Sequence, residues 1–234
     1  MRFLGERLHA AGHTVYGARV AGHATSVEDL ERASWRDWYA SVSAPLAEIR
    51  RQADHVVVVG QSMGSLLALA LAAQHPEDIA AVVLLAPALV LQQRWLQRVR
   101  SILPLVARMP GQRFRYLAKG RSDIADPAAH VDRECYDRIP LRAVHQLLSL
   151  QRHARRQLPR VRQPVLVVHS HQDHSCSTAG IRQLERELAG SLEIIMLDNS
   201  YHVVSVDFDR ERVASAVDSF ATKTRRLNAG PIES

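Results

Sequence analysis

The sequence predicts an α/β fold with a mostly parallel sheet and helices on both faces. Apolar, β-branched runs alternate along the chain with segments of helical periodicity, and several runs are apolar at every position. The chain has 234 residues, of which 47% are hydrophobic and 23% charged, as is usual for a globular domain. We therefore expect one α/β domain that carries an insertion.

The first part of the chain predicts a helix, a strand and another helix. Leu4 and Leu8 share one helix face, and Gly12 is suited to end that helix. Residues 13–20 (HTVYGARV) then predict a strand. The next helix begins after Ser34, a good N-cap residue.

The rest of the chain supplies four further apolar runs that predict buried strands. A helix over 66–74 follows the first run, and an amphipathic helix around Val217 follows the last. The four runs are 55–60, 79–87, 164–170 and 192–198.

A long segment separates the second and third of these runs, although a crossover between parallel strands needs only about a dozen residues. Its arginines and prolines predict short helices and loops, which we interpret as a cap over 87–163. The core is then expected to comprise 1–86 and 164–226, with a disordered tail over 227–234.

The run at 55–60 leads into Gly60-Gln61-Ser62-Met63-Gly64, which matches G-x-S-x-G between a buried strand and a helix. Such a tight turn strains the serine backbone, and we expect glycine on both sides to prevent steric clashes. The turn raises the Ser62 hydroxyl above the carboxyl edge of the sheet. There the N–H of Met63 can face a developing oxyanion. The simpler interpretation is a serine that caps a helix beside two turn glycines.

A nucleophilic serine needs a base, and the base needs an orienting carboxylate. Asp173 and His202 each follow a predicted strand, and the order Ser62, Asp173, His202 is the one expected of this kind of fold. Two other acids compete for the role. Asp198 ends a strand, and Asp207 is placed to cap the final helix.

The sequence resembles the bacterial carboxylesterases and monoacylglycerol lipases of the α/β-hydrolase superfamily. The resemblance covers nearly the whole chain. The matching stretches are AGHATSVEDLERASWRDW, GQSMGSLLALALA, YDRIPLRAVHQLL, LPRVRQPVLVVHSHQD and NSYHVVSVD.

This resemblance implies an α/β-hydrolase fold in which Ser62 is the nucleophile, Asp173 the triad acid and His202 the general base. It also implies hydrolysis of short- to medium-chain acyl esters or monoacylglycerols, with the cap shaping an apolar acyl pocket. No cofactor and no metal are expected. The partner is a small acyl ester, and the sequence leaves the oligomeric state open.

Several positions depart from the family pattern. Alanines stand at 21 and 24, where a proline and a glycine are usual, and serines at 65 and 170 replace glycines. The loop around Asp173 differs as well. Near Gly22, His23 is expected to shape its loop rather than to react.

The largest departure is at the start, where the family has a strand and a His-Gly loop before the first helix. We expect the first core strand and the second oxyanion donor to be missing from this chain, and Met1 to be a doubtful start. Without that strand, each buried backbone N–H or C=O group that loses its hydrogen-bond partner on the neighbouring strands would lower the free energy of unfolding by about 1–3 kcal/mol. The alternative to an active esterase is therefore a catalytically impaired binding protein of the same fold.

A second alternative is a zinc hydrolase. Residues 169–174 (HSHQDH) resemble the zinc signature H-x-H-x-D-H of another hydrolase fold, and imidazoles two residues apart can share a metal. The α/β alternation before this segment argues against that fold. Three loop histidines in a chain with 12 histidines are the simpler interpretation.

Composition excludes some classes of protein. The formal net charge of +6 comes mainly from arginines, without the interleaved aromatic residues of a nucleic-acid surface. We expect no nucleic-acid partner and at most weak association with lipid surfaces. Only Cys135 and Cys176 are present, and no signal peptide is evident, so a reducing cytoplasmic setting is expected.

Overall fold

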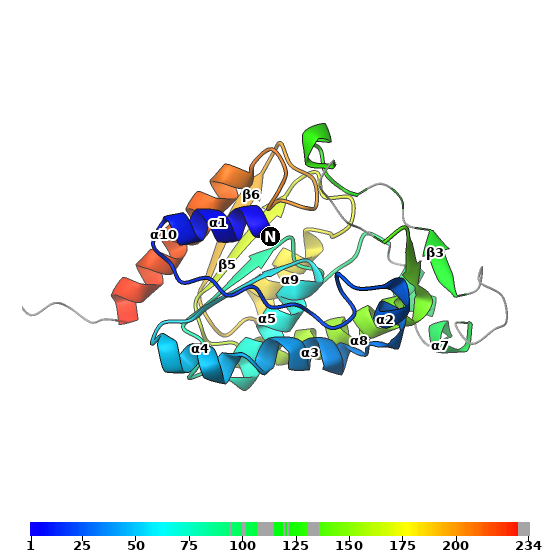
Figure 1. The fold of residues 1–234 in the computed structure, drawn as a ribbon, viewed down its shortest axis with the longest axis horizontal. Helices are drawn as coiled ribbons and strands as arrows, with labels where there is room; N and C mark the ends of the chain where they lie inside the picture. The colour runs from blue at the N-terminus through cyan, green and yellow to red at the C-terminus, as the bar shows by residue number, and fades with distance from the viewer. Residues whose placement is uncertain are drawn as a thin grey trace, which may run out of the picture.

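The computed structural model describes residues 1–93, 95–99, 102–106, 115–118, 120, 122–130 and 136–228. Its centre is a sheet of four parallel strands in the order β1-β2-β5-β6 (Figure 1). This sheet confirms the predicted α/β fold, and all four apolar runs of the sequence form strands. The strands are β1 (Val57–Gln61), β2 (Ala81–Leu85), β5 (Val165–Ser170) and β6 (Leu192–Leu197).

Helices cover both faces of the sheet. Helices α1 and α10 pack on one face, and α2, α3, α4, α5, α8 and α9 lie on the other side (Figure 1). The helices of the first face are α1 (Arg2–Ala10) and α10 (Arg210–Asn228). Those of the second side are α2 (Val27–Arg32), α3 (Trp35–Ser43), α4 (Leu46–Gln52), α5 (Met63–Gln74), α8 (Leu141–Gln157) and α9 (Ala179–Glu187).

Strand β2 shows why the central runs are apolar throughout. Val82 and Leu84 belong to the cluster that packs on α5 and α8, whereas Ala81, Val83 and Leu85 belong to the cluster under α1 and α10. All five side chains are fully buried. Because successive strand residues point to opposite faces, a strand covered on both sides needs an apolar residue at every position.

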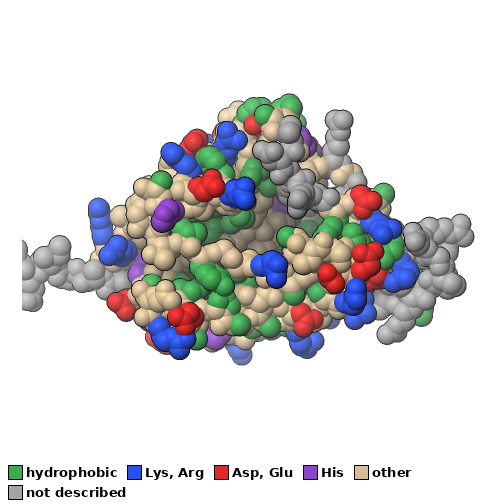
Figure 2. All heavy atoms as spheres, in the orientation of Figure 1, with side chains coloured by type: hydrophobic (Ala, Val, Ile, Leu, Met, Phe, Trp, Pro, Cys, Tyr) green, Lys and Arg blue, Asp and Glu red, His purple; other side chains and the backbone are tan. Residues whose placement is uncertain are grey.

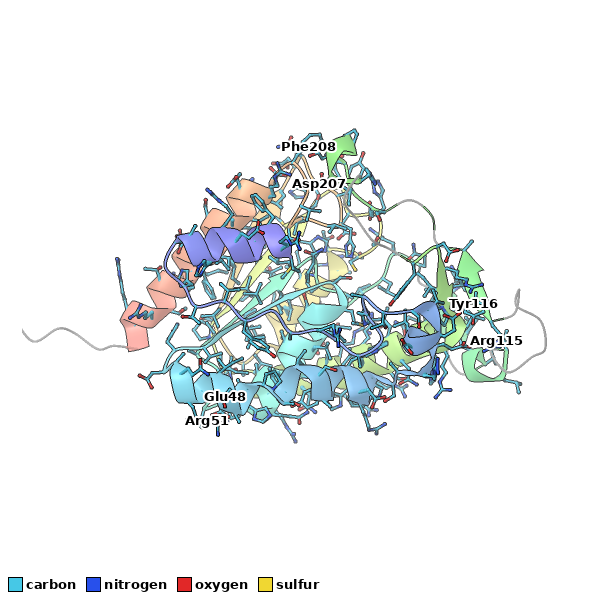
Figure 3. The ribbon with its side chains drawn as sticks, viewed as in Figure 1. Glu48, Arg51, Arg115, Tyr116, Asp207 and Phe208 are labelled. Carbon is cyan, nitrogen blue, oxygen red and sulfur yellow. The ribbon has the colours of Figure 1, made fainter. Side chains whose placement is uncertain are left out.

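The segment between β2 and β5 contains short helices, as predicted, but also a small antiparallel sheet of β3 (Tyr116–Ala118) and β4 (Arg138–Pro140). The neighbouring Arg115 forms an ion pair of 2.8 Å with Glu31 of α2 (Figure 3). The boundaries 87–163 of the cap stay a prediction. Its other short elements are α6 (Trp95–Val99), α7 (Leu103–Val106), η2 (Pro127–His130) and η3 (Leu158–Arg160).

The predicted strand at 13–20 is wrong. The segment joins α1 to α2 without pairing to any described strand, and Val15 and Tyr16 are 42% and 61% exposed. An alternating apolar pattern forms a strand only beside a partner, and 13–20 has no such partner. Among the described residues β1 pairs only with β2, so it is an outer strand. The missing first strand stays a prediction.

The C-terminal helix is longer than predicted. Leu227 and Asn228 belong to α10, so the expected disordered tail is wrong for these two residues, while 229–234 lie outside the described residues. On the face in Figure 2, basic and acidic side chains are interspersed rather than gathered into one basic patch. Across the described residues, no helix combines the length and apolar character needed to span a bilayer.

Candidate active site

Ser62 occupies the turn between β1 and α5, as the motif predicts. Its backbone dihedrals of φ 55° and ψ −114° lie outside the regions that L residues favour, so the turn stores strain at this residue. The end of β2 and the turn after it hold Ser62 in this conformation. The Ser62 N–H donates to the carbonyl of Leu85 at 2.8 Å, and the Ser62 carbonyl accepts from the N–H of Ala88 at 3.2 Å.

The two glycines of the motif are not equivalent. A Cβ at Gly60 would lie 2.2 Å from the carbonyl oxygen of Gly64, so any side chain at 60 would force the strand and helix apart. A Cβ at Gly64 meets no described atom within 4 Å beyond the backbone of its own helix. The expectation that both glycines relieve clashes is therefore wrong for Gly64, because the helix directs its Cβ position into open space.

Ser65, at a departure from the family pattern, supports the same turn. Its buried hydroxyl donates to the carbonyl of Gly60 at 2.8 Å and approaches that of Leu85 at 3.3 Å. The serine therefore ties the first turn of α5 to the ends of β1 and β2.

The structure brings Ser62, Asp173 and His202 together. The Ser62 Oγ lies 2.9 Å from Nε2 of His202, and Nδ1 of His202 lies 2.8 Å from Oδ2 of Asp173. An ionised carboxylate only accepts, so the imidazole proton lies on Nδ1 and Nε2 is left to accept from the serine hydroxyl. Three residues that are distant in sequence thus form one hydrogen-bonded chain at the carboxyl edge of the sheet.

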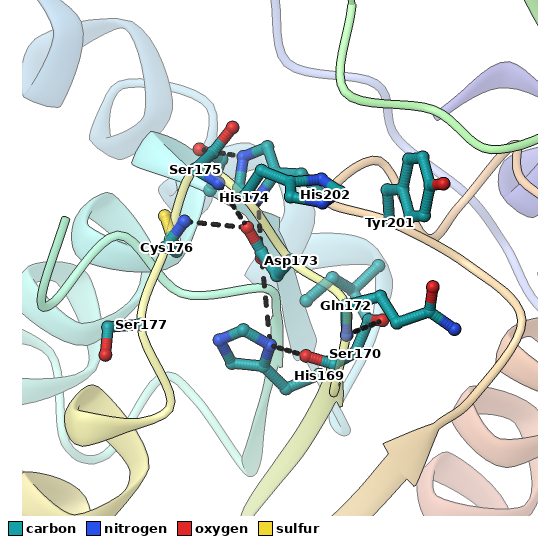
Figure 4. Close-up of polar contacts among 12 residues, drawn as sticks. His169, Ser170, Gln172, Asp173, His174, Ser175, Cys176, Ser177, Tyr201 and His202 are labelled. Atoms are coloured by element: carbon teal, nitrogen blue, oxygen red, sulfur yellow. Dashed lines mark hydrogen bonds and ion pairs between the residues drawn. The ribbon is translucent and has the colours of Figure 1, made fainter. Parts of the chain in front are cut away.

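The backbone of its own loop fixes the carboxylate of Asp173. Oδ1 accepts the N–H groups of Ser175 and Cys176 at 2.8 and 2.7 Å, which leaves Oδ2 for His202 (Figure 4). Burial alone would raise the pKa of Asp173. The hydrogen bond and charge of His202, together with the N–H of Cys176, outweigh burial, so this pKa lies below its usual value.

His169, at the end of β5, lies behind the same carboxylate. Its side chain is fully buried, its Nδ1 is 3.7 Å from Oδ2 of Asp173, and it also lies 3.1 Å from the carbonyl of Ser170 (Figure 4). Burial lowers the pKa of His169 against the raising effects of Asp173 and the Ser170 carbonyl. Its Nε2 has no hydrogen-bond partner among the described residues.

The two competing acids do not pair with His202. The side chain of Asp198 is 76% exposed and lies 3.9 Å from His171. Asp207, labelled in Figure 3, lies near the end of the loop that joins β6 to α10. Its buried carboxylate accepts N–H groups of the loop and the insertion, so the predicted N-cap role is wrong. The donors are Ala125, Asp126, Tyr201 and Phe208, all at 2.8–2.9 Å.

Asp123, a residue that the sequence analysis did not find, connects the insertion to both loops of the site. Its carbonyl accepts the N–H groups of His202 and Val203 at 3.1 and 3.2 Å. Its carboxylate accepts from the backbone and ring of His174 and from the hydroxyl of Ser175, at 2.8–3.0 Å. No local pattern distinguishes this aspartate from the chain's other acids, and only the fold brings it to the site.

Met63 and His23, which the sequence also singled out, lie in different surroundings from each other. Met63 is the first residue of α5, and the first N–H groups of a helix have no intrahelical acceptor, so its N–H is available at the turn. His23 lies away from the hydrogen-bonded chain. It contacts the carbonyl of Ala21 at 3.2 Å and the ring of Trp38 edge-on, in keeping with a role in loop structure.

The histidines of the HSHQDH segment do not converge. His169 is buried, whereas the side chains of His171 and His174 are 58% and 65% exposed and face Asp198 and Asp123. Within the described part of the chain, the one group of side chains close enough to share a metal ion consists of Asp173, Cys176 and His202. The zinc-hydrolase alternative thus lacks the ligand set on which it rested.

Cys176 is the second feature that the sequence analysis did not place at the site. Its side chain is buried, and its sulfur lies within 4.8 Å of ligand atoms of Asp173 and His202. Burial, then the charges of Asp173 and Asp123, raise the pKa of the thiol well above its usual value, against the lowering effect of Ser62. The thiol is therefore protonated at neutral pH.

Comparison with known protein families connects this geometry to hydrolases. The family model described as serine aminopeptidase, S33, matches residues 2–209, which include the strand–serine–helix turn, Asp173 and His202. The chain belongs to the serine aminopeptidase S33 family. The match spans the sheet and the insertion and ends just before α10.

One relative in sequence and two solved structures agree with this placement. The chain is 31% identical over 226 residues to a thermostable monoacylglycerol lipase of Bacillus sp. (strain H-257), covering 95% of this chain and 85% of that protein. A structure reported for LipS and LipT, two metagenome-derived lipolytic enzymes, matches with a TM-score of 0.85 and 28% identity, covering 95% of this chain and 87% of that one.

The monoacylglycerol lipase of Paleococcus ferrophilus matches with a TM-score of 0.78 over 94% of this chain and 88% of its own. At 22% identity this match shows the fold alone. Together the comparisons confirm the α/β-hydrolase fold that the sequence resemblance implied.

Proposed function

We propose that this protein hydrolyses carboxylic esters, either short- to medium-chain acyl esters or monoacylglycerols, through an acyl-enzyme intermediate. The observation that carries the proposal is the hydrogen-bonded chain from Asp173 through His202 to Ser62, at 2.8 and 2.9 Å. The names of the lipase relatives support the substrate class.

In the proposed mechanism, His202 Nε2 takes the proton of Ser62 as Oγ attacks the ester carbonyl, and returns it to the leaving alcohol. Asp173 keeps the imidazole in the required tautomer and stabilises its positive charge. The N–H of Met63 donates to the oxyanion of the tetrahedral intermediate. A water molecule activated by His202 then hydrolyses the acyl-enzyme. No cofactor enters these steps.

The strained backbone of Ser62 supports the role of nucleophile. A serine that merely capped α5 would accept from a helix N–H, but its side chain makes no cap hydrogen bond and turns to His202 instead. The strain at φ 55° is therefore coupled to the position of the hydroxyl.

The test is a chain-length series of p-nitrophenyl esters and 1-monoacylglycerols, with an aminoacyl p-nitroanilide as the amide substrate. We expect ester cleavage with an optimum at one acyl length, and Ser62→Ala to lower kcat by about 10⁴–10⁶-fold. Asp173→Asn should lower kcat by about 10⁴-fold, because an amide can donate to Nδ1 and favours the wrong tautomer. Cleavage of the anilide alone, or a Ser62→Ala variant as active as the wild type, would contradict the proposal.

A further inference from the structure

Cys176 adds a sulfur ligand to the two polar side chains of the proposed triad. One ligand atom each from Asp173, Cys176 and His202 lies within 4.8 Å of the others; Asp173 and Cys176 are buried, and the side chain of His202 is 12% exposed. Hydrolysis by the proposed mechanism needs no sulfur at this place, so the position of Cys176 is not explained by the reaction.

We propose that Asp173, Cys176 and His202 form an inhibitory site for a zinc ion. A carboxylate oxygen, a thiolate and an imidazole nitrogen are the ligands that zinc prefers, at about 2.0–2.3 Å from the metal. Ligand atoms around one zinc ion then lie about 3–4 Å apart, so atoms already within 4.8 Å need to move by about 1 Å or less to surround it.

Charge favours a cation at this position. A further carboxylate, that of Asp123, is 14% exposed and accepts from the hydroxyl of Ser175 in the loop that carries Asp173 and Cys176. Binding replaces the thiol proton: Zn²⁺ and the neutral thiol give a zinc-bound thiolate and one proton, which passes to the buffer. The dication thereby neutralises two negative ligands that would otherwise repel each other.

Inhibition follows because zinc and the reaction need the same groups. When the imidazole of His202 binds zinc, it can no longer keep its hydrogen bonds to both Ser62 and Asp173, and the carboxylate no longer fixes its tautomer. Zinc binding itself depends only on the positions of the three ligands, whereas the inhibitory effect rests on the proposed function.

The experiment uses zinc chloride and the full chain. Competition with a chromophoric zinc chelator measures affinity, and ester hydrolysis measures inhibition, with each variant normalised to its own zinc-free rate. Wild type should bind one zinc ion, lose activity in parallel and regain it with EDTA. Cys176→Ala should weaken both binding and inhibition at least about tenfold, the lower end of what loss of a mere supporting partner costs.

Control variants show whether zinc binds at Asp173, Cys176 and His202 or elsewhere on the chain. Cys135→Ala, which removes the other thiol of the chain, and His171→Ala, which removes an exposed histidine, should leave zinc affinity unchanged. Zinc binding should release about one more proton in wild type than in Cys176→Ala. Should the alanine variant fold poorly, Cys176→Ser keeps the size of the side chain without the thiolate, and zinc should then raise the Tm of wild type only.

The outcomes are distinct. Wild-type zinc affinity in Cys176→Ala and Cys176→Ser, or no zinc binding by an active wild type, would overturn the inhibitory site. Cysteine-dependent zinc binding by a protein that hydrolyses no ester would overturn the proposed function and leave the metal site standing.

Discussion

Replacement of Gly60 by alanine is the sharpest test of how the fold positions Ser62. The added Cβ would lie 2.2 Å from the Gly64 carbonyl oxygen and 2.6 Å from the Ser65 nitrogen, closer than Cβ atoms approach backbone. The strand and helix must therefore separate by about 1 Å, and a misplacement of about 1 Å costs about 10²-fold in rate. Because Ser62 lies between them, its 2.9 Å contact with His202 should be lost.

We expect Gly60→Ala to lower kcat/KM for a p-nitrophenyl ester by about 10²-fold and the free energy of unfolding by about 1–3 kcal/mol. Steady-state kinetics and urea denaturation measure the two effects. Gly64→Ala is the matched control, since its Cβ meets open space and alanine favours a helix by about 1 kcal/mol over glycine. Equal losses of stability in the two variants, or wild-type kinetics in Gly60→Ala, would refute the steric argument.

Three other substitutions test separate parts of the account. Asp123→Ala should lower kcat about 10–100-fold with little change in KM, because His174 and Ser175, in the loop that carries Asp173, lose their contacts with the Asp123 carboxylate, and Asp123→Asn should restore part of the loss. Equal effects on kcat and KM would argue against a positioning role. His169→Asn should flatten the dependence of unfolding free energy on pH. The pKa of His169 is lowered in the folded state, so below about pH 6.5 the unfolded chain binds more protons than the folded one. The unfolding free energy of wild type therefore falls by up to about 1.4 kcal/mol for each unit by which the pH is lowered in that range. The same pH dependence of unfolding free energy in wild type and variant from pH 5 to 8 would contradict this. Ala24→Gly should raise the free energy of unfolding by about 0.5–1 kcal/mol, and with it Tm, because Ala24 has a φ of 56°, which glycine adopts without strain. An unchanged or lower Tm would contradict that expectation.

The parts of the fold that the sequence predicts are those where a local pattern and the tertiary environment agree. The run of valines before Gly60 is apolar at every position because β1 lies inside a covered sheet, and the motif after it specifies the turn. Ser34 likewise caps α3 through a capping box with Asp37, as its spacing predicts. The candidate triad follows from the order of residues after successive strands.

The features of the fold and the site that could not be predicted from the sequence depend on contacts with residues that are distant in the chain. Residues 13–20 have a strand-like pattern, but a pattern forms no ladder without a partner. Asp207 precedes α10 as a helix cap would, yet its carboxylate turns to backbone groups of the insertion. No local sequence pattern marks Asp123 or Cys176, because each reaches the site only through loops that the folded sheet brings together.

Fluorophosphonate labelling followed by intact mass measurement shows whether Ser62 is an activated nucleophile, since the probe reacts only with an activated serine. We predict one adduct on wild type, mapped to Ser62, no adduct on Ser62→Ala, and labelling of His202→Ala slowed by at least about 10²-fold. A folded wild-type chain that takes no label, or an adduct on another residue, would contradict the account and favour a catalytically impaired binding protein.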